Sequence, residues 1–256
     1  MPNTPLILAD LDDTLFQTMR KLGPDAPPVD QLAVGAYDRE MKPRSFMTAQ
    51  QSMLVNWMLE HAELIPVTAR GTEEISRVAI KFKSWAVTTH GAVILKPDGT
   101  PDEDWQAFML ARLVGFHDRI QLIQETATAL FRDKGIDAWA RINFEYGKPI
   151  YLVMKHRSSA KLDELYSAGA ELESLVDTEG FYIHRNSNNI AWLPHCVEKG
   201  LAVEFLLAKL SKEQEARPVI GLGDSLSDHR FLRHCSWWGV PQQSQFAGLI
   251  ESTLDL

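Results

Sequence analysis

Several short apolar runs along the chain end in polar or charged side chains. Residues 5–9 form the first run and lead directly into Asp10-Leu11-Asp12-Asp13-Thr14. A short, continuous apolar run is typical of a strand buried on both faces, as in a parallel sheet. Residues 64–67 and 218–222 repeat the pattern, and they are followed by Thr68-Ala69-Arg70 and by Gly223-Asp224-Ser225-Leu226-Ser227-Asp228. We therefore predict a parallel sheet, and in open α/β folds ligands bind at the carboxyl ends of such strands.

Between these strands the pattern predicts helices and shorter elements. Helical spacing and a possible cap at Thr48 predict a helix over residues 48–61, and acidic residues in a first turn predict another over 72–82. Further helices are expected over 197–210 and 229–234, and short strands over 85–89, 92–95 and 237–240. Residues 29–47 have weak periodicity, which favours an exposed loop, with a small flap near the site as the alternative. We expect the aromatic pairs Phe181-Tyr182 and Trp237-Trp238 to lie in the core.

The pattern changes between about residues 101 and 188. A helical stretch over 104–134 with a break near Gly115 precedes two strands over 138–146 and 149–156, whose alternation is typical of an antiparallel sheet with one exposed face. A helix over 158–176, capped by Ser158, and strands over 180–186 and 189–193 follow. This α-β-β-α-β-β order predicts a compact α+β unit. We therefore predict a parallel-sheet α/β core of residues 1–100 and 189–256, with an α+β domain of residues 101–188 inserted into it.

Composition excludes some classes of protein. The 256 residues carry a net charge of −8, which disfavours a nucleic-acid or anionic-membrane partner, since either needs a basic face. Hydrophobic residues make up 45% of the chain and no run reaches the length of a membrane span, as expected for a globular protein. The two cysteines and the lack of a secretory pattern at the start predict a cytoplasmic protein with free, structural thiols.

The first strand end offers candidate chemistry. Side chains two apart on a strand share a face, so we expect Asp10 and Asp12 to point the same way. Two carboxylates that close repel each other, and a divalent cation with oxygen ligands would relieve the repulsion. The alternative is a solvated, Asp-rich turn after a strand. Thr68, Lys199 and Asp224 each have a similar alternative on their own, as a helix cap, a solvated lysine or a turn residue, but their shared position after buried strands or at a helix start favours one site.

The order of these motifs resembles the haloacid dehalogenase (HAD) superfamily. Asp10-Leu11-Asp12-Asp13-Thr14, then Thr68-Ala69-Arg70, then Lys199 and then 223–228 are similar to its four motifs. The inserted α+β domain resembles the cap of subfamily IIB, which holds the Cof-type, sucrose-phosphate, trehalose-phosphate and mannosyl-phosphoglycerate phosphatases. The resemblance implies a Rossmann-like, HAD-like core with a cap. The chain departs from the usual pattern at Ala69 and Ser227, where Gly and Asn are common, and at His90-Gly91, where Asn-Gly is common.

The resemblance also implies a reaction and a role for each motif residue. Mg²⁺, held by Asp10, Asp224 and the backbone carbonyl of Asp12, would offset the charge of a phosphomonoester. Asp10 would attack phosphorus to give an aspartyl-phosphate, and Asp12 would act as general acid and then general base. Thr68 and Lys199 would hold the phosphoryl oxygens. Asp228 and Ser225 would support this group from behind, with Asp228 fixing Lys199 or a metal-bound water.

These roles predict a Mg²⁺-dependent phosphatase for a small phosphorylated metabolite, with a sugar phosphate as the expected substrate. The cap is expected to close over the site and set specificity. Candidate substrate contacts are Arg70, His90, Arg141, Asn143, Lys148, Arg185 and Asn188, each of which is otherwise an ordinary exposed residue. The first alternative is a phosphosugar mutase of the same fold. A dehalogenase is disfavoured by Asp12. A receiver or non-catalytic phosphate-binding module is disfavoured by the chain length and by the intact set Asp10, Asp12, Lys199 and Asp224.

Overall fold

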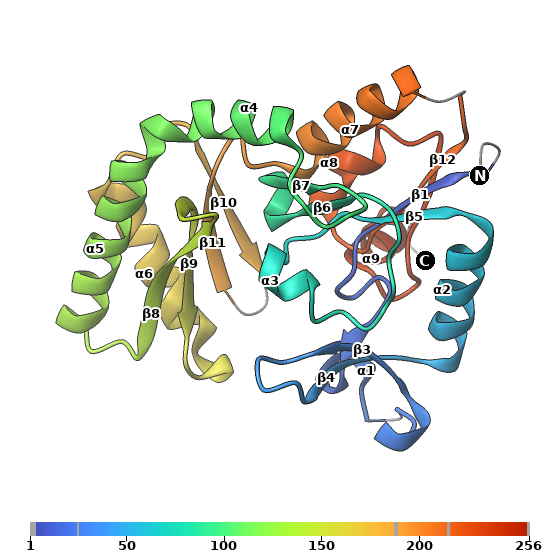
Figure 1. Cartoon of the computed structure of the whole chain (residues 1–256). Helices are drawn as coiled ribbons and strands as arrows, with labels where there is room; N and C mark the ends of the chain where they lie inside the picture. Colours follow the sequence, from blue (N-terminus) through green and yellow to red (C-terminus); the bar gives the residue numbers. More distant parts are fainter. Residues whose placement is uncertain (1–3, 25, 187–188, 214–215, 255–256) are drawn as a thin grey trace. The chain divides into compact units, whose positions relative to one another are not determined.

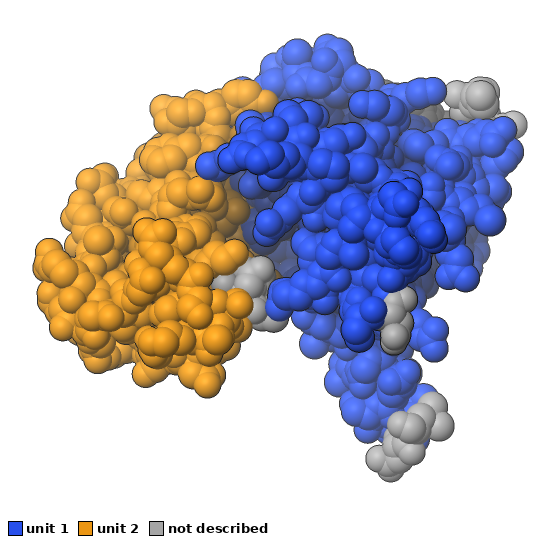
Figure 2. Space-filling model, turned by 90° about the horizontal axis from the view of Figure 1, so that it is seen from below, with its two compact units in different colours: residues 1–106, 198–256 blue, residues 107–197 orange. Residues whose placement is uncertain are grey.

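The protein consists of two compact units. A computed structural model describes residues 4–24, 26–186, 189–213 and 216–254. Unit 1 comprises Met1–Gln106 and Glu198–Leu256, and unit 2 comprises Ala107–Val197 (Figure 2). The insertion therefore begins and ends later than the expected residues 101 and 188. The second boundary differs because strand β11 (Asn189–Pro194), which the sequence pattern assigns to the core, pairs within the sheet of unit 2.

A four-stranded parallel sheet forms the centre of unit 1, as predicted. Its order is β13 (Trp237–Gly239), β12 (Val219–Leu222), β1 (Leu6–Ala9) and β5 (Glu63–Pro66). The last three of these strands are labelled in Figure 1. Ala9 at the end of β1 lies opposite Leu222 and Pro66, the last residues of its two neighbours. Because the three strands end at one level, the segments that follow them emerge at the same edge of the sheet.

Helices bury the apolar faces of this sheet. The helix α2 (Ala49–His61) begins with a capping box, in which the Thr48 side chain accepts from the Gln51 N–H. Val55 and Met58 of α2 share a core cluster with Ile7 and Ala9, which lie on one face of β1. The other helices of unit 1 are α1 (Met19–Leu22), α3 (Thr72–Ile75), α7 (Lys199–Glu213), α8 (His229–Leu232), which follows the 3-10 turn η5 (Leu226–Asp228), and α9 (Gln245–Thr253).

The expected exposed loop at residues 29–47 is wrong. After the 3-10 turn η1 (Val29–Gln31), the chain forms a small antiparallel sheet of β2 (Gln17–Thr18), β4 (Pro43–Met47) and β3 (Ala33–Tyr37). This sheet also explains why α3 ends at Ile75 rather than near residue 82. Ala79 N–H donates to Gly35 and Tyr37 N–H donates to Arg77, so the segment after α3 is extended against β3.

A two-stranded antiparallel sheet of β6 (Ala86–Thr88) and β7 (Val93–Leu95) completes unit 1. The 3-10 turn η2 (Thr89–Gly91) connects the two strands, and all three of its residues have a positive φ. Such a conformation is rare for the β-branched Thr89 and indicates backbone strain.

Unit 2 has the predicted α-β-β-α-β-β order. Its antiparallel sheet follows the order β10 (Phe181–Asn186), β11, β9 (Lys148–His156) and β8 (Ala138–Glu145). α4 (Glu103–Leu113), which crosses the unit boundary, η3 (Val114–Phe116) and α5 (His117–Asp133) precede the sheet, so the expected break near Gly115 is confirmed. α6 (Leu162–Leu175) follows η4 (Ser159–Lys161), and the Ser158 side chain does not cap it. α5 and α6 pack on the sheet face that carries Leu152, Met154 and Trp192.

Candidate active site

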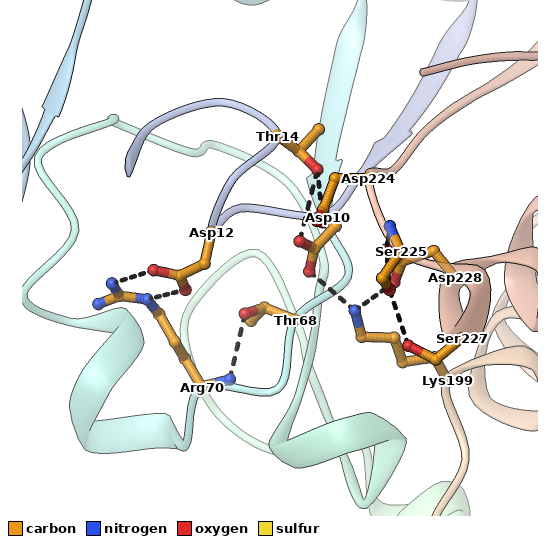
Figure 3. Close-up of polar contacts among 10 residues, drawn as sticks. All are labelled: Asp10, Asp12, Thr14, Thr68, Arg70, Lys199, Asp224, Ser225, Ser227 and Asp228. Atoms are coloured by element: carbon orange, nitrogen blue, oxygen red, sulfur yellow. Dashed lines mark hydrogen bonds and ion pairs between the residues drawn. The ribbon is translucent and has the colours of Figure 1, made fainter. Parts of the chain in front are cut away.

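Asp10 is the centre of the candidate site. It follows the last residue of β1, and its backbone N–H donates to Leu222 of β12, which fixes it to the edge of the sheet. Its carboxylate is almost completely buried and accepts a hydrogen bond of 2.8 Å from the Lys199 ammonium (Figure 3). A buried charge needs a partner of opposite sign, and Lys199 supplies it.

Lys199 is held between two carboxylates. It is the first residue of α7, and its Nζ donates to Asp10 at 2.8 Å and to Asp228 at 2.7 Å. The start of α7 is fixed by Glu198, whose carboxylate accepts from the backbone N–H groups of Gly200 and Leu201. Lys199 therefore joins two acids that are far apart in the sequence, Asp10 directly after β1 and Asp228 at the end of the 3-10 turn η5 (Leu226–Asp228).

The loop after β12 supplies the remaining acids. Asp224 and Asp228 place carboxylate oxygens near Asp10, and the three contributing oxygens lie within 4.8 Å of one another. Asp228 accepts from both the backbone N–H and the hydroxyl of Ser225, at 3.0 and 2.7 Å, so the predicted supporting pair is in contact. The hydroxyl of Ser225 also lies 2.7 Å from that of Ser227, which stands where Asn is common in the resembling family.

Burial and mutual repulsion shift the pKa values of this cluster. Burial raises the pKa of Asp10 well above its usual value, although Lys199 opposes this. Burial, with the charges of Asp228 and Asp13, raises the pKa of Asp224 to about 6. Lys199 lowers the pKa of Asp228 against the effect of burial, and the two acids raise the pKa of Lys199 although its burial acts to lower it. Lys199 is therefore charged at neutral pH and compensates the acids only in part.

The donor set fits a hard divalent cation. Magnesium and calcium bind oxygen ligands, mainly carboxylates, carbonyls and water. Asp10, Asp224 and Asp228 offer such oxygens in close proximity, with Lys199 as their neutralising partner. Burial and neighbouring carboxylates raise the pKa of Asp10 and Asp224, so both acids are ionised less readily than in water. A bound cation would favour their ionised forms.

Asp12 does not point the same way as Asp10, contrary to the simple alternation argument. Strand β1 ends at Ala9, and the side chain of Asp12 leaves the acidic cluster and meets Arg70 (Figure 3). Arg70 donates from Nε to one Asp12 oxygen at 2.7 Å and from a terminal nitrogen to the other at 2.8 Å. The guanidinium also lies 5.1 Å from the centre of the Phe16 ring. Arg70 is therefore a partner of Asp12, and its two-pronged contact fixes the direction of that carboxylate.

Thr68 and His90 lie together at the adjacent strand ends. Thr68 is buried, and its Oγ accepts from the backbone N–H of Arg70 at 3.1 Å, which leaves its hydroxyl proton to donate elsewhere. The backbone N–H groups of Thr89 and His90 donate to the carbonyls of Arg70 and Thr68. The strained turn η2 thus ties the Thr68–Arg70 loop in place.

The other expected substrate contacts belong to unit 2. Arg141 and Asn143 are on β8, where one Arg141 nitrogen donates to Asn143 at 3.4 Å. Lys148 is the exposed first residue of β9. Arg185 forms an ion pair with Glu173 of α6, so its side chain lies on the face of the sheet that the helices cover. Asn188 lies outside the described residues.

Sequence reasoning missed two residues of the site. The Thr14 hydroxyl lies 3.5 Å from Asp10 and 3.3 Å from Asp224, so it bridges the two acids. Asp13, which has a φ of 65°, acts electrostatically on Asp224 and pairs with Lys21 at 3.0 Å. The signal for both was their place directly after Asp12 in the first motif.

The fold matches solved structures over nearly its whole length. Sucrose-phosphatase from Synechocystis sp. PCC6803, solved with sucrose and phosphate, is 13% identical with a TM-score of 0.52, covering 99% of this chain and 98% of that chain. A trehalose-6-phosphate phosphatase related protein is 20% identical with a TM-score of 0.51, covering 98% of each chain. A haloacid dehalogenase-like hydrolase from Bacteroides thetaiotaomicron is 11% identical with a TM-score of 0.50, covering 98% and 100%.

These similarities confirm the predicted fold, a HAD-like parallel-sheet core with an additional α+β unit. No protein-family model matches the sequence, and no curated protein matches it either. Among the described residues, no helix is both long and apolar enough to span a membrane.

Proposed function

We propose that this protein is a Mg²⁺-dependent phosphatase that hydrolyses a small phosphorylated metabolite through an aspartyl-phosphate on Asp10. The observation that carries the proposal is the position of Lys199, which bonds Asp10 and Asp228 while Asp224 lies beside them. A buried carboxylate flanked by an ammonium group and further acids combines a nucleophile with the means to neutralise a phosphate dianion. The neighbours of the same fold that carry phosphatase names support this reading.

Each residue of the site has a distinct role in the proposed reaction. The Mg²⁺ held by Asp10, Asp224 and the Asp12 backbone carbonyl would supply charge neutralisation at the phosphoryl group. Asp10 forms the bond to phosphorus, and the Thr68 hydroxyl and Lys199 ammonium donate to the phosphoryl oxygens. Asp12 protonates the departing alcohol and later takes a proton from the attacking water. Asp228 keeps Lys199 in place, and Ser225 keeps Asp228 in place.

The substrate we propose is a sugar phosphate. The face of the unit 2 sheet opposite α5 and α6 carries Trp139, Arg141 and Asn143, by alternation along β8. An aromatic ring beside an arginine and an amide offers an apolar surface and hydrogen-bonding groups, which suits a hydroxylated ring. Arg141→Ala should therefore raise the KM for a sugar phosphate while leaving turnover of p-nitrophenyl phosphate unchanged. Arg185→Ala, on the helical side, is the control and should change neither.

The direct test of the reaction is phosphate release from p-nitrophenyl phosphate with Mg²⁺ or EDTA. We expect activity only with Mg²⁺, and we expect Asp10→Asn to lower the rate by about 10³-fold or more, as loss of a nucleophile does. Full activity in EDTA or in Asp10→Asn would overturn the proposal. A screen of phosphorylated metabolites then identifies the substrate. Isomerisation of a hexose phosphate without phosphate release would instead indicate the mutase.

A further inference from the structure

The helix α9 contacts the acidic loop, which we define as residues 223–228. Phe246, the second residue of α9, is only 8% exposed, and its backbone N–H donates to the carbonyl of Asp224 at 3.4 Å. The first N–H groups of a helix have no partner within the helix, so this group is available to the loop. The following N–H, that of Ala247, donates to the Ser244 hydroxyl at 3.0 Å. The beginning of α9 therefore holds the backbone of Asp224.

The Phe246 ring contacts structure at both ends of the acidic loop. Its centre lies 5.5 Å from the ring of Trp238 in β13 and 6.2 Å from that of His229, the first residue of α8. These are usual distances for aromatic pairs. His229 directly follows the last residue of the loop. Gly239, next to Trp238, accepts at 3.4 Å from the backbone N–H of Gly223, the first residue of the loop.

The two tryptophans of β13 are not in the core, contrary to expectation. Trp237 is 63% exposed and Trp238 is 43% exposed. The rings of Trp238 and His229 lie 6.2 Å apart, so these two rings and that of Phe246 form one cluster. Phe246 is the buried member of this cluster, because the other two residues are exposed. Removing its side chain therefore leaves both ends of the acidic loop with less packing.

Asp224 depends on its backbone for its position more than the other clustered acids do. Asp10 and Asp228 each pair with Lys199. In the part of the chain that the structure describes, the Asp224 side chain forms no ion pair, and it accepts a hydrogen bond of 3.3 Å from the Thr14 hydroxyl. The direction of its carboxylate therefore follows the backbone of the acidic loop.

We propose that Phe246 is a positioning residue for Asp224 and thereby for the cation that the clustered acids bind. Its N–H holds the Asp224 backbone, and its ring packs against the elements at both ends of the loop. Without the ring the loop moves more freely, and the Asp224 carboxylate spends less time beside those of Asp10 and Asp228. This inference rests on the proposed Mg²⁺ site and adds to it a residue that lies in none of the sequence motifs.

The test is the affinity of the free protein for Mg²⁺, measured by isothermal titration calorimetry at neutral pH. We expect Phe246→Ala, which keeps the N–H and removes the ring, to raise the Kd about tenfold, the lower end for residues that orient metal ligands. Phe246→Leu keeps part of the apolar contact and should recover part of the affinity. Phe181→Ala is the matched control, because Phe181 of unit 2 is 7% exposed and also has two ring neighbours. It should lower the Tm without changing the Kd.

A second measurement on the unmodified protein guards against a variant that does not fold. Because coupling is reciprocal, Mg²⁺ should slow hydrogen exchange of the Phe246 amide, which donates to Asp224, and leave that of the Phe181 amide unchanged. An unchanged Kd in Phe246→Ala, an equal rise in Phe181→Ala, or exchange at Phe246 that Mg²⁺ does not affect overturns the proposal.

These measurements do not use turnover, so they separate the role of Phe246 from the proposed activity. A protein that binds Mg²⁺ with the expected dependence on Phe246, yet releases no phosphate from any substrate, supports the positioning role and contradicts the phosphatase. A parent protein that binds no Mg²⁺ overturns the positioning role together with the metal site.

Discussion

The ammonium group of Lys199 compensates two buried carboxylates, and this predicts how the protein responds when it is removed. Lys199→Met leaves the carboxylates of Asp10 and Asp228 without a positively charged partner. Removing one partner of a buried ion pair lowers the free energy of unfolding by about 3–5 kcal/mol. We expect a lower Tm and loss of phosphatase activity. The control is Lys209→Met, because Lys209 also pairs with a buried acid, Asp102. That variant should be less stable and still active, whereas an active Lys199→Met protein would contradict the assigned role.

The contact between Arg70 and Asp12 predicts an effect that depends on the leaving group. If Arg70 directs the carboxylate that protonates the departing alcohol, Arg70→Ala should lower kcat/KM for an alkyl phosphate by about 10²-fold, the lower end of general-acid contributions. p-Nitrophenolate leaves without a proton, so its ester should lose far less. Arg70→Lys should recover only part of the activity, since one ammonium cannot contact both oxygens in the same way. Equal losses for both substrates would show that Arg70 acts on the phosphoryl group instead.

Site residues that are positioned by their own strand could be predicted from the sequence, whereas those positioned by contacts with distant residues could not. Asp10, Thr68 and Asp224 could be predicted to come together, because each follows a buried strand of one parallel sheet. The direction of Asp12 could not, since it lies beyond the end of β1 and its side chain is set by a contact with a residue 58 positions away. Thr14 escaped notice for a similar reason, because its bridge to Asp224 exists only after the strands have paired.

Among the elements, the strained turn η2 connects two motifs of the site, and paired glycine variants can show this. Gly91 has a φ of +95°, and a Cβ there would lie 2.4 Å from the carbonyl oxygen of Glu198, next to Lys199. Gly99 has a φ of +82° with no neighbour within 4 Å of such a Cβ. Gly99→Ala should therefore cost only backbone strain of about 1–2 kcal/mol, whereas Gly91→Ala adds overpacking of about 1–3 kcal/mol. Denaturant unfolding measures the difference, and phosphatase activity should fall only in Gly91→Ala. Equal stability losses would refute the close contact.

The secondary-structure elements that could not be predicted from the sequence are those with weak hydrophobic periodicity. Residues 33–47 form two strands because β4 pairs with both β2 and β3, a tertiary pairing that local pattern does not reveal. The helix α9 was not predicted, and only Phe246 of its apolar face is buried. By contrast, α2 and the break between α4 and α5 could be predicted, because a cap and a glycine mark them locally.

For the whole molecule, the topology could be predicted because unit 1 is assembled from both ends of the chain. Residues 1–106 and 198–256 share one sheet, and the antiparallel pattern of the intervening residues differs clearly from the buried parallel strands. The C-terminal boundary of the insertion could not be predicted, because the apolar pattern of β11 fits a strand of the core and a strand of unit 2 equally well. The sheet of unit 1 brings Asp10, Asp224 and Asp228 close together, and the repulsion between these acids lowers the stability of the folded protein.

That cost predicts how stability depends on pH and Mg²⁺. The pKa of Asp224 rises from 3.8 to about 6 on folding, and that of Asp10 rises too, so their protonation favours the folded state. Stability from these groups is present at low pH and is lost as pH rises through about 6. The Tm of the metal-free protein should therefore fall as pH rises from 3.8, where Asp224 ionises in the unfolded chain, to about 6, where it ionises in the folded protein. Asp228, whose pKa is lowered, acts with the opposite sign and only in more acidic solution.

Mg²⁺ should reverse this loss at neutral pH, because it binds the ionised acids of the folded state. At a free concentration of about 100 times Kd, binding contributes about 2.7 kcal/mol, or a rise in Tm of about 5–10 °C for a chain of this size. Asp224→Asn removes one repelling charge and one ligand. The metal-free variant should have a higher Tm at neutral pH than the metal-free parent, and Mg²⁺ should raise it little. Differential scanning calorimetry with EDTA or Mg²⁺ tests both, and a Tm that is independent of Mg²⁺ in the parent protein would mean that the clustered acids do not hold the cation.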